Sequence, residues 1–186
     1  PGGASSPRKA LILAASMLFG LIAGTAFLLI REMRNNSFRS VTEMERETGN
    51  PVIGQVPIIP SSRRQDTMTY LKSKPTSAAA EAIRNLRTSI MLSKIDTPPK
   101  IIMVCSSLPG EGKTTTSLAL AMNFASMGRK TLLIEGDIRR QAISKYITGV
   151  SDKGIMPILT GETDLASVIT HSDLIGADVL AGGRKV

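Results

Sequence analysis

The chain has 186 residues, of which 42% are hydrophobic and 20% charged, enough for one ordinary domain with additional segments. Its net charge is +8, but aromatic residues make up only 3% and tryptophan is absent, which excludes the base-stacking surfaces of a single-strand nucleic-acid binder. We therefore expect no nucleic-acid partner, and we expect the cations to face phosphate or anionic lipid. The single cysteine, Cys105, excludes an internal disulfide framework and a cysteine zinc site.

An uncharged stretch at 10–30 follows a short Pro- and Gly-rich stub at 1–9. A helix of this length crosses a hydrocarbon core of about 30 Å, so we expect a transmembrane helix. A cleaved signal peptide is the alternative, although its apolar run usually has only about 7 to 15 residues. The cations beside the stretch are more numerous on its C-terminal side, which predicts that the residues after 30 are cytoplasmic. These cations are Arg8 and Lys9 before it, and Arg31, Arg34, Arg39 and Arg46 after it.

Small residues recur within this stretch at every fourth position, namely Ser16, Gly20 and Gly24. They would lie on one helix face, where a second helix backbone can approach closely. Glycine is also common in membrane helices generally, so both self-association and an ordinary membrane span fit this pattern.

Residues 31–76 lose the apolar period and contain several Pro and Gly residues that break any long helix. We expect a juxtamembrane linker here. Its cations can lie against anionic headgroups or simply in solvent.

The segment that begins at Ser77 has apolar residues at helical spacing, which predicts an amphipathic helix with Ser77 as its N-cap. Its other side carries Glu81, Arg84 and Arg87 at three-residue intervals, so these side chains can touch one another. Such a row is usually a solvated face. Spacing alone gives little support to a subunit interface.

The stretch SSLPGEGKTTTS, at 106–117, lies between an apolar run at 101–106 and a helix-forming run that ends near Gly128. We expect a buried strand at 101–106, a phosphate-binding loop, a helix, and a second buried strand at 129–135. Glycines let the loop turn its N–H groups inward, and the helix N-terminus adds a positive dipole end. Lys113 would reach the β and γ phosphates, and the Thr114 hydroxyl would ligate Mg²⁺. The residues expected to contact the nucleotide are Pro109, Gly110, Glu111, Gly112, Lys113, Thr114 and Thr115.

Two carboxylates follow the second predicted strand, Glu135 and Asp137. Residues two apart on an extended chain point the same way, and ligands bind at the carboxyl ends of parallel strands. Asp137 is therefore a candidate Mg²⁺ ligand, and a capping role in the turn is the alternative. Arg139 and Arg140 could reach phosphate or a neighbouring molecule.

Taken together, the apolar N-terminal stretch, the Glu81/Arg84/Arg87 row, SSLPGEGKTT and LLIEGDIRR resemble bacterial tyrosine kinases. The resemblance is to the fused type that joins a polysaccharide co-polymerase, or chain-length determinant, to a cytoplasmic autokinase. It implies an α/β fold with the parallel sheet of a P-loop NTPase, spanning 77–186 and lacking its Walker B half.

The resemblance also implies functional roles. ATP and Mg²⁺ are the expected cofactors, Lys113 and Asp137 the catalytic residues, and Thr114, Asp137 and Glu135 the metal ligands. Glu135 stands where the family usually has Asp, so its place in the metal shell is open. Glu81, Arg84 and Arg87 would join subunits into a ring in the bacterial inner membrane, beside the polysaccharide export machinery.

The resemblance implies that the intact protein, rather than 1–186 alone, is the active kinase, because no second aliphatic strand ending in Asp and no tyrosine cluster occurs here. We therefore expect the chain to be part of a longer protein. Two alternatives stay open. One is a membrane scaffold in which nucleotide only switches assembly, and the other is a partitioning-type P-loop ATPase.

Overall fold

The computed structural model describes residues 9–33, 38, 40–93 and 96–183. The chain divides into two compact units, Pro1–Val52 and Ile53–Val186, and each is described by itself. The elements of the first unit are α1 (Lys9–Met33) and α2 (Val41–Thr48). Those of the second unit are α3 (Arg64–Ser73), α4 (Ala78–Leu92), α5 (Lys113–Ala125), β1 (Leu132–Ile134), η1 (Ile143–Lys145), α6 (Met156–Leu159), η2 (Leu165–Ser167), β2 (Thr170–Ser172) and β3 (Ala177–Leu180).

Helix α1 covers the uncharged stretch, so the predicted helix at 10–30 is confirmed. At 25 residues it is about 37 Å long. Its mean hydropathy reaches 2.2, and its residues are exposed within the chain, so it is long and apolar enough to cross a membrane. Three of the flanking cations named above, Arg8, Arg34 and Arg39, lie outside the described residues.

The stretch predicted as a linker contains no long helix among its described residues, as expected, but it does contain the two short helices α2 and α3. Helix α2 begins at Ser40, whose hydroxyl accepts from the Glu43 N–H at 3.1 Å. Helix α3 was not predicted. It buries Met68 and Leu71 in the core of the second unit, so these residues belong to the compact fold.

Helix α4 confirms the predicted amphipathic helix. The Ser77 hydroxyl accepts from the Ala80 N–H at 3.3 Å and caps its first turn. The predicted apolar stripe is buried, and Ile83 at its centre is only 1% exposed. The buried stripe consists of Ala79, Ala80, Ile83, Leu86 and Ile90.

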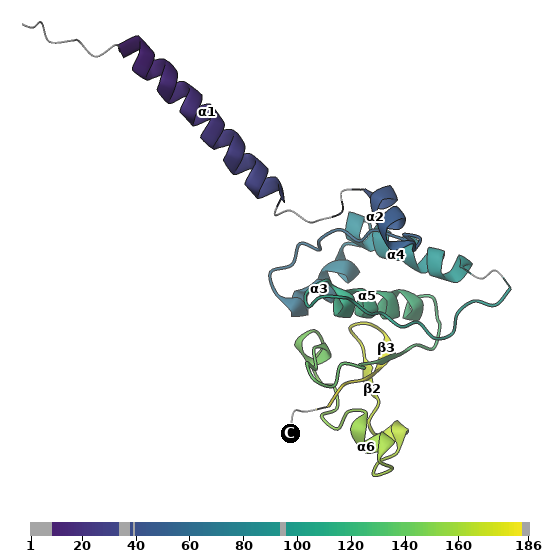
Figure 1. Ribbon diagram of the computed structural model, residues 1–186. Helices are drawn as coiled ribbons and strands as arrows, with labels where there is room; N and C mark the ends of the chain where they lie inside the picture. The colour runs from purple at the N-terminus through teal and green to yellow at the C-terminus, as the bar shows by residue number, and fades with distance from the viewer. Residues whose placement is uncertain (1–8, 34–37, 39, 94–95, 184–186) are drawn as a thin grey trace, which may run out of the picture. The chain divides into compact units, whose positions relative to one another are not determined.

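Helix α5 is the centre of the second unit. It contacts α3 and α4 on one side and β1 and β3 on the other (Figure 1). This position explains why α5 is apolar on several sides, with Leu118 and Ala119 fully buried. The helix ends at Ala125, and Gly128 continues the chain with a φ of +75°, close to the predicted end.

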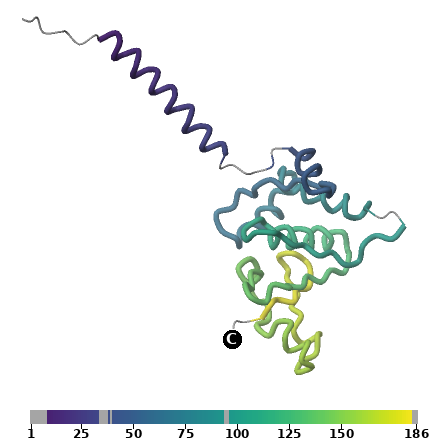
Figure 2. The backbone as a smooth tube through the Cα atoms, in the orientation of Figure 1, coloured from purple at the N-terminus to yellow at the C-terminus, as the bar shows by residue number. Residues whose placement is uncertain are grey.

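The sheet has the strand order β1-β3-β2. Strands β1 and β3 pair in parallel, with Leu133 opposite Val179, and this pair agrees with the predicted parallel sheet. Strand β2 adds an antiparallel edge that was not predicted, with His171 opposite Asp178. Figure 2 shows the C-terminal strand in yellow beside the green segment that follows α5.

The strand predicted at 101–106 is wrong. These residues form no strand, and Ile101 and Met103 are 91% and 85% exposed. Cys105 is exposed as well. An apolar run forms a strand only where a neighbouring strand accepts its backbone hydrogen bonds, and no strand in the described part of the chain pairs with this one.

Candidate functional site

The loop at 106–113 adopts the tight turn that its glycines predicted. Gly110 and Gly112 have φ angles of +90° and +86°, which side chains other than glycine rarely adopt. The Glu111 carboxylate accepts from the Leu108 N–H at 3.1 Å and closes the loop on itself. Gly112 is the N-cap of α5, so the loop leads directly into the positive end of that helix.

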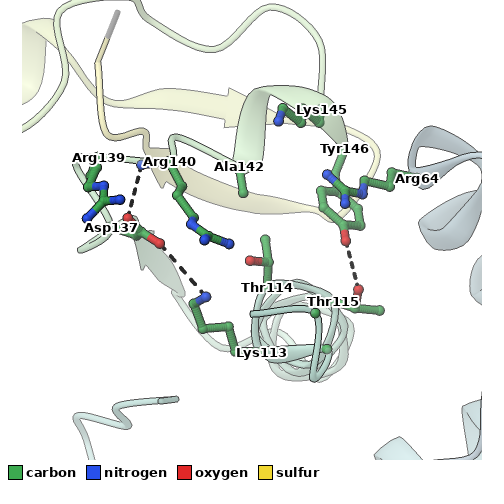
Figure 3. Close-up of a pocket in the computed structure, with 12 residues that line it drawn as sticks. Arg64, Lys113, Thr114, Thr115, Asp137, Arg139, Arg140, Ala142, Lys145 and Tyr146 are labelled. Carbon is green, nitrogen blue, oxygen red and sulfur yellow. Dashed lines mark hydrogen bonds and ion pairs between the residues drawn. The ribbon is translucent and has the colours of Figure 1, made fainter. Parts of the chain in front are cut away.

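A pocket of about 590 Å³ opens beside this loop (Figure 3). Five of its lining side chains are cationic and only one, Asp137, is a carboxylate, which gives the lining a net charge of +4. A surface of this kind favours a ligand that carries several negative charges. The charged lining residues are Arg64, Lys113, Arg139, Arg140, Lys145 and Asp137.

The pocket brings together most of the predicted nucleotide contacts. Gly110, Gly112, Lys113, Thr114 and Thr115 line it. The two other loop residues of the prediction, Pro109 and Glu111, do not line it, and the Glu111 side chain turns back onto its own loop.

Lys113 and Asp137 face each other across the pocket, with Nζ and Oδ2 3.8 Å apart, and each side chain is about one-third exposed. The other Asp137 oxygen accepts from the Arg140 N–H at 3.0 Å (Figure 3). Asp137 is thus held by the turn that follows β1, within reach of the lysine of the loop.

The expectation that Glu135 and Asp137 point the same way is wrong. Strand β1 ends at Ile134, so the alternation of an extended chain does not continue through 135–137. Glu135 is buried and does not line the pocket, and its oxygens accept from the N–H groups of Ala142, Ile143 and Gly182. Its assignment as a metal ligand stays a prediction that this placement does not favour.

The Glu81, Arg84 and Arg87 row lies on α4, outside the pocket lining. The Arg84 guanidinium pairs with Glu81 and also donates to the Pro75 carbonyl. Arg87 donates to the side chain of Asn123 on α5 at 3.1 Å. The three residues form contacts within the chain, and their role between subunits stays a prediction.

Sequence reasoning missed three charged or polar residues of the pocket. Arg64 begins α3, and Lys145 and Tyr146 lie at η1. The Tyr146 hydroxyl lies 3.0 Å from the Thr115 hydroxyl, and this contact joins the loop side of the pocket to its opposite wall. No motif signals these residues, although the basic pair Arg63 and Arg64 is visible in the sequence.

The residues present fit ATP and Mg²⁺. The cationic lining matches a polyphosphate, and the Thr114 hydroxyl and Asp137 carboxylate supply oxygens on the same pocket. In the described part of the chain, no group of three or more His, Cys, Asp or Glu residues is placed to hold a metal. Mg²⁺ commonly takes only one or two protein oxygens and completes its shell with phosphate and water.

Comparison with known proteins gives the family. An AAA domain family matches residues 79–185, more than half of the chain. The chain belongs to this family. Its AAA domain includes the loop, the pocket residues from Gly110 to Tyr146, and the whole sheet.

Relatives confirm the resemblance to bacterial tyrosine kinases. A putative tyrosine-protein kinase AmsA of Erwinia amylovora is 30% identical over 96% of this chain and 27% of its own length. The succinoglycan biosynthesis transport protein ExoP of Rhizobium meliloti is 27% identical over 87% of this chain and 24% of its own length. The chain therefore spans about a quarter of the length of these relatives.

The fold agrees with a solved kinase domain. The kinase domain of the Escherichia coli tyrosine kinase ETK superimposes with a TM-score of 0.70 at 28% identity, covering 79% of this chain and 61% of that one. The predicted α/β class is thereby confirmed, and the parallel pair of β1 and β3 agrees with the predicted parallel sheet.

Proposed function

We propose that this chain is the ATP-binding part of a membrane-anchored protein-tyrosine autokinase that regulates the chain length and export of an exopolysaccharide. The observation that carries the proposal is the pocket in which the glycine loop, Lys113 and Asp137 meet, with a net charge of +4 on its lining. The similarity to tyrosine kinases supports the choice of reaction.

The loop would bind the phosphates of ATP through its inward N–H groups and the N-terminus of α5. The Lys113 ammonium, now paired with Asp137, would turn to the β and γ phosphates and stabilise the charge that develops on the transferred phosphoryl group. Arg139, Arg140 and Lys145 surround the same space and would add to this stabilisation.

Thr114 and Asp137 are the residues that would hold Mg²⁺, which when bound neutralises phosphate charge. Asp137 is already oriented by the Arg140 N–H, and its second oxygen, which now pairs with Lys113, would be the one that holds the metal. In the transfer, the bond from the γ phosphorus to the ADP oxygen would break, a bond to a tyrosine oxygen would form, and the tyrosine hydroxyl proton would pass to solvent water.

The tyrosine would belong to a neighbouring subunit in a ring joined through Glu81, Arg84 and Arg87. The ring would lie at the cytoplasmic face of the bacterial inner membrane, anchored by α1, beside the polysaccharide export machinery. The exposed apolar surface of α1 supports the anchor, and the name of the ExoP relative supports the pathway.

The test compares the full-length protein with its Lys113→Ala variant. We expect ATP affinity, measured by calorimetry, to fall between about tenfold and 150-fold, because the variant loses a charge-assisted contact of about 1.5–3 kcal/mol. We expect phosphotyrosine on immunoblots to disappear. Lys130→Ala is the matched control, since Lys130 is exposed and does not line the pocket.

Three results would contradict the proposal. ATP binding that does not depend on Lys113 would show that this pocket is not the nucleotide site. Lys113-dependent ATP binding without phosphotyrosine or ATP hydrolysis would favour the nucleotide-switched scaffold. ATP hydrolysis without phosphotyrosine would favour the partitioning-type ATPase.

A further inference from the structure

Glu135 is a buried carboxylate with an unusual set of partners. Its side chain is 6% exposed, and one oxygen accepts from the N–H groups of both Ala142 and Ile143, the latter at 2.9 Å. The other oxygen accepts from the Gly182 N–H at 2.8 Å. Its partners are therefore backbone amides, which satisfy an anion without involving any side chain of the pocket.

These hydrogen bonds join three separate parts of the chain. Glu135 follows β1, Gly182 follows β3, and Ala142 and Ile143 begin η1. The Glu135 N–H also donates to the Leu180 carbonyl at 2.9 Å, so the residue ties the ends of the two parallel strands together through backbone and side chain.

The backbone around Glu135 is arranged so that its amides can approach the carboxylate. A Cβ atom at residue 182 would lie 3.2 Å from Glu135 Oε2 and 3.2 Å from Gln141 Cγ, so a glycine there lets the amide approach. Gln141 has a φ of +46°, which is unfavourable for a residue with a side chain. The two amides that follow this strained residue are those that Glu135 binds.

The segment held in this way is one wall of the nucleotide pocket. It begins at Asp137 and ends at Tyr146, and Glu135 binds it in its middle at Ala142 and Ile143. The wall residues are Asp137, Arg139, Arg140, Ala142, Lys145 and Tyr146.

We propose that Glu135 is a positioning residue that fixes the 137–146 wall of the pocket through backbone amides, and that it does not ligate the metal. The proposal rests on the proposed function, because it assumes that this pocket binds ATP. It explains why the longer Glu stands here, since its carboxylate must extend from the end of β1 to both η1 and the residues after β3.

Glu135→Asp separates positioning from metal binding. A positioning carboxylate shortened by one methylene no longer meets all three amides. We therefore expect faster hydrogen exchange at Ala142, Ile143 and Gly182 in the nucleotide-free, full-length protein. A metal ligand would tolerate Asp, a common Mg²⁺ ligand, with exchange at these amides unchanged.

Nucleotide binding gives the second readout. At a temperature where the variants are folded, we expect Glu135→Asp and Glu135→Gln to bind ATP between about tenfold and a hundredfold more weakly, the usual range for residues that orient a ligand. The Mg²⁺ concentration for half-saturation should stay unchanged. Asp137→Asn is the matched comparison, and it should raise that Mg²⁺ concentration while leaving exchange at Gly182 unchanged.

The proposal is overturned if Glu135→Asp keeps both exchange protection and ATP affinity, or if it changes the Mg²⁺ requirement alone. Gly182→Ala tests the same contact from the other side and should also speed exchange at Ala142. Loss of the whole fold in Glu135→Asp, Glu135→Gln and Gly182→Ala would contradict positioning, because Glu135 would then be a general stability residue. If the wild-type protein bound no ATP, the proposed function would be wrong. The hydrogen-exchange result would still test whether Glu135 holds the 137–146 wall.

Discussion

Arg64 lies at the positive end of a helix dipole, where Asp66 supplies a negative charge in the same first turn. It is the first residue of α3, directly after Arg63 at the N-cap, and both cations lie at the positive end of the helix dipole. Neither residue provides a side-chain cap, and Arg64 lines the nucleotide pocket. Bound phosphate would further offset the repulsion between the helix dipole and these cations, which gives α3 a direct part in binding.

We expect Arg64→Ala to weaken ATP binding by about threefold to fivefold, because an exposed charge pair contributes at most about 1 kcal/mol. Arg63→Ala is the matched control, since it removes a cation from the same helix end but not from the pocket lining. Calorimetry on the full-length protein measures both. Equal effects from the two variants would show that Arg64 acts only through the helix dipole.

At the scale of residues, the sequence predicted the pocket where a local pattern carries the chemistry. Lys113 and Thr114 follow from the glycine loop, and Asp137 follows from the end of a strand. The place of Glu135 could not be predicted, because it depends on where β1 stops. Arg64 could not be predicted either, since only tertiary packing brings α3 to the loop.

At the scale of elements, helix α3 shows that the burial of a segment, and not its amino-acid composition, decides whether it is part of the compact fold. Its sequence is mainly polar, but Met68 is fully buried and Leu71 is 4% exposed. Met103 has the same side chain in an apolar run and is 85% exposed. The two methionines therefore allow a matched comparison.

We expect Met68→Ala to lower the free energy of unfolding by about 2–5 kcal/mol, through lost burial and a cavity. Met103→Ala should change it by no more than about 0.5 kcal/mol. Urea titration of the full-length protein measures both values. A large effect at Met103 would show that the 101–106 run is covered in the full-length protein.

Elements with a clear helical period were predicted correctly, whereas among the short strands only β1 was, since it lies within the strand predicted at 129–135. The apolar stripe of α4 and the serine before it specify the helix without reference to the rest of the chain. A strand forms only where a neighbouring strand accepts its backbone hydrogen bonds, so the apolar run at 101–106 led to a wrong strand prediction. Strand β3 was missed because Asp178 interrupts its apolar residues.

At the scale of the whole molecule, the proposed function requires the pocket to lie on the cytoplasmic side of the membrane that α1 would cross, because ATP is available only on that side. The cations after residue 30 agree with that side. The α/β class and the N-terminal apolar helix were predictable, since both depend on long or repeated patterns. The proposed ring of subunits does not follow from such patterns, because it depends on surfaces of other chains.

Cys105 provides a test of the topology, since it is exposed and is the single cysteine of these 186 residues. A membrane-impermeant maleimide should label it in inverted membrane vesicles and leave it unlabelled in intact spheroplasts. Cys105→Ser identifies the labelled site by losing the signal. Labelling in spheroplasts would place the pocket outside the cytoplasm and would contradict the proposed anchor.

The cationic lining of the pocket has one more consequence. Without a ligand, five positive side chains gathered around a single carboxylate repel one another, and dissolved salt weakens that repulsion because its ions screen charges over about 10 Å at 0.1 M. A bound polyphosphate cancels the same repulsion from within. The protein without ligand should therefore gain thermal stability from ionic strength, whereas the protein with bound polyphosphate should not, because salt also screens the attraction between lining and ligand.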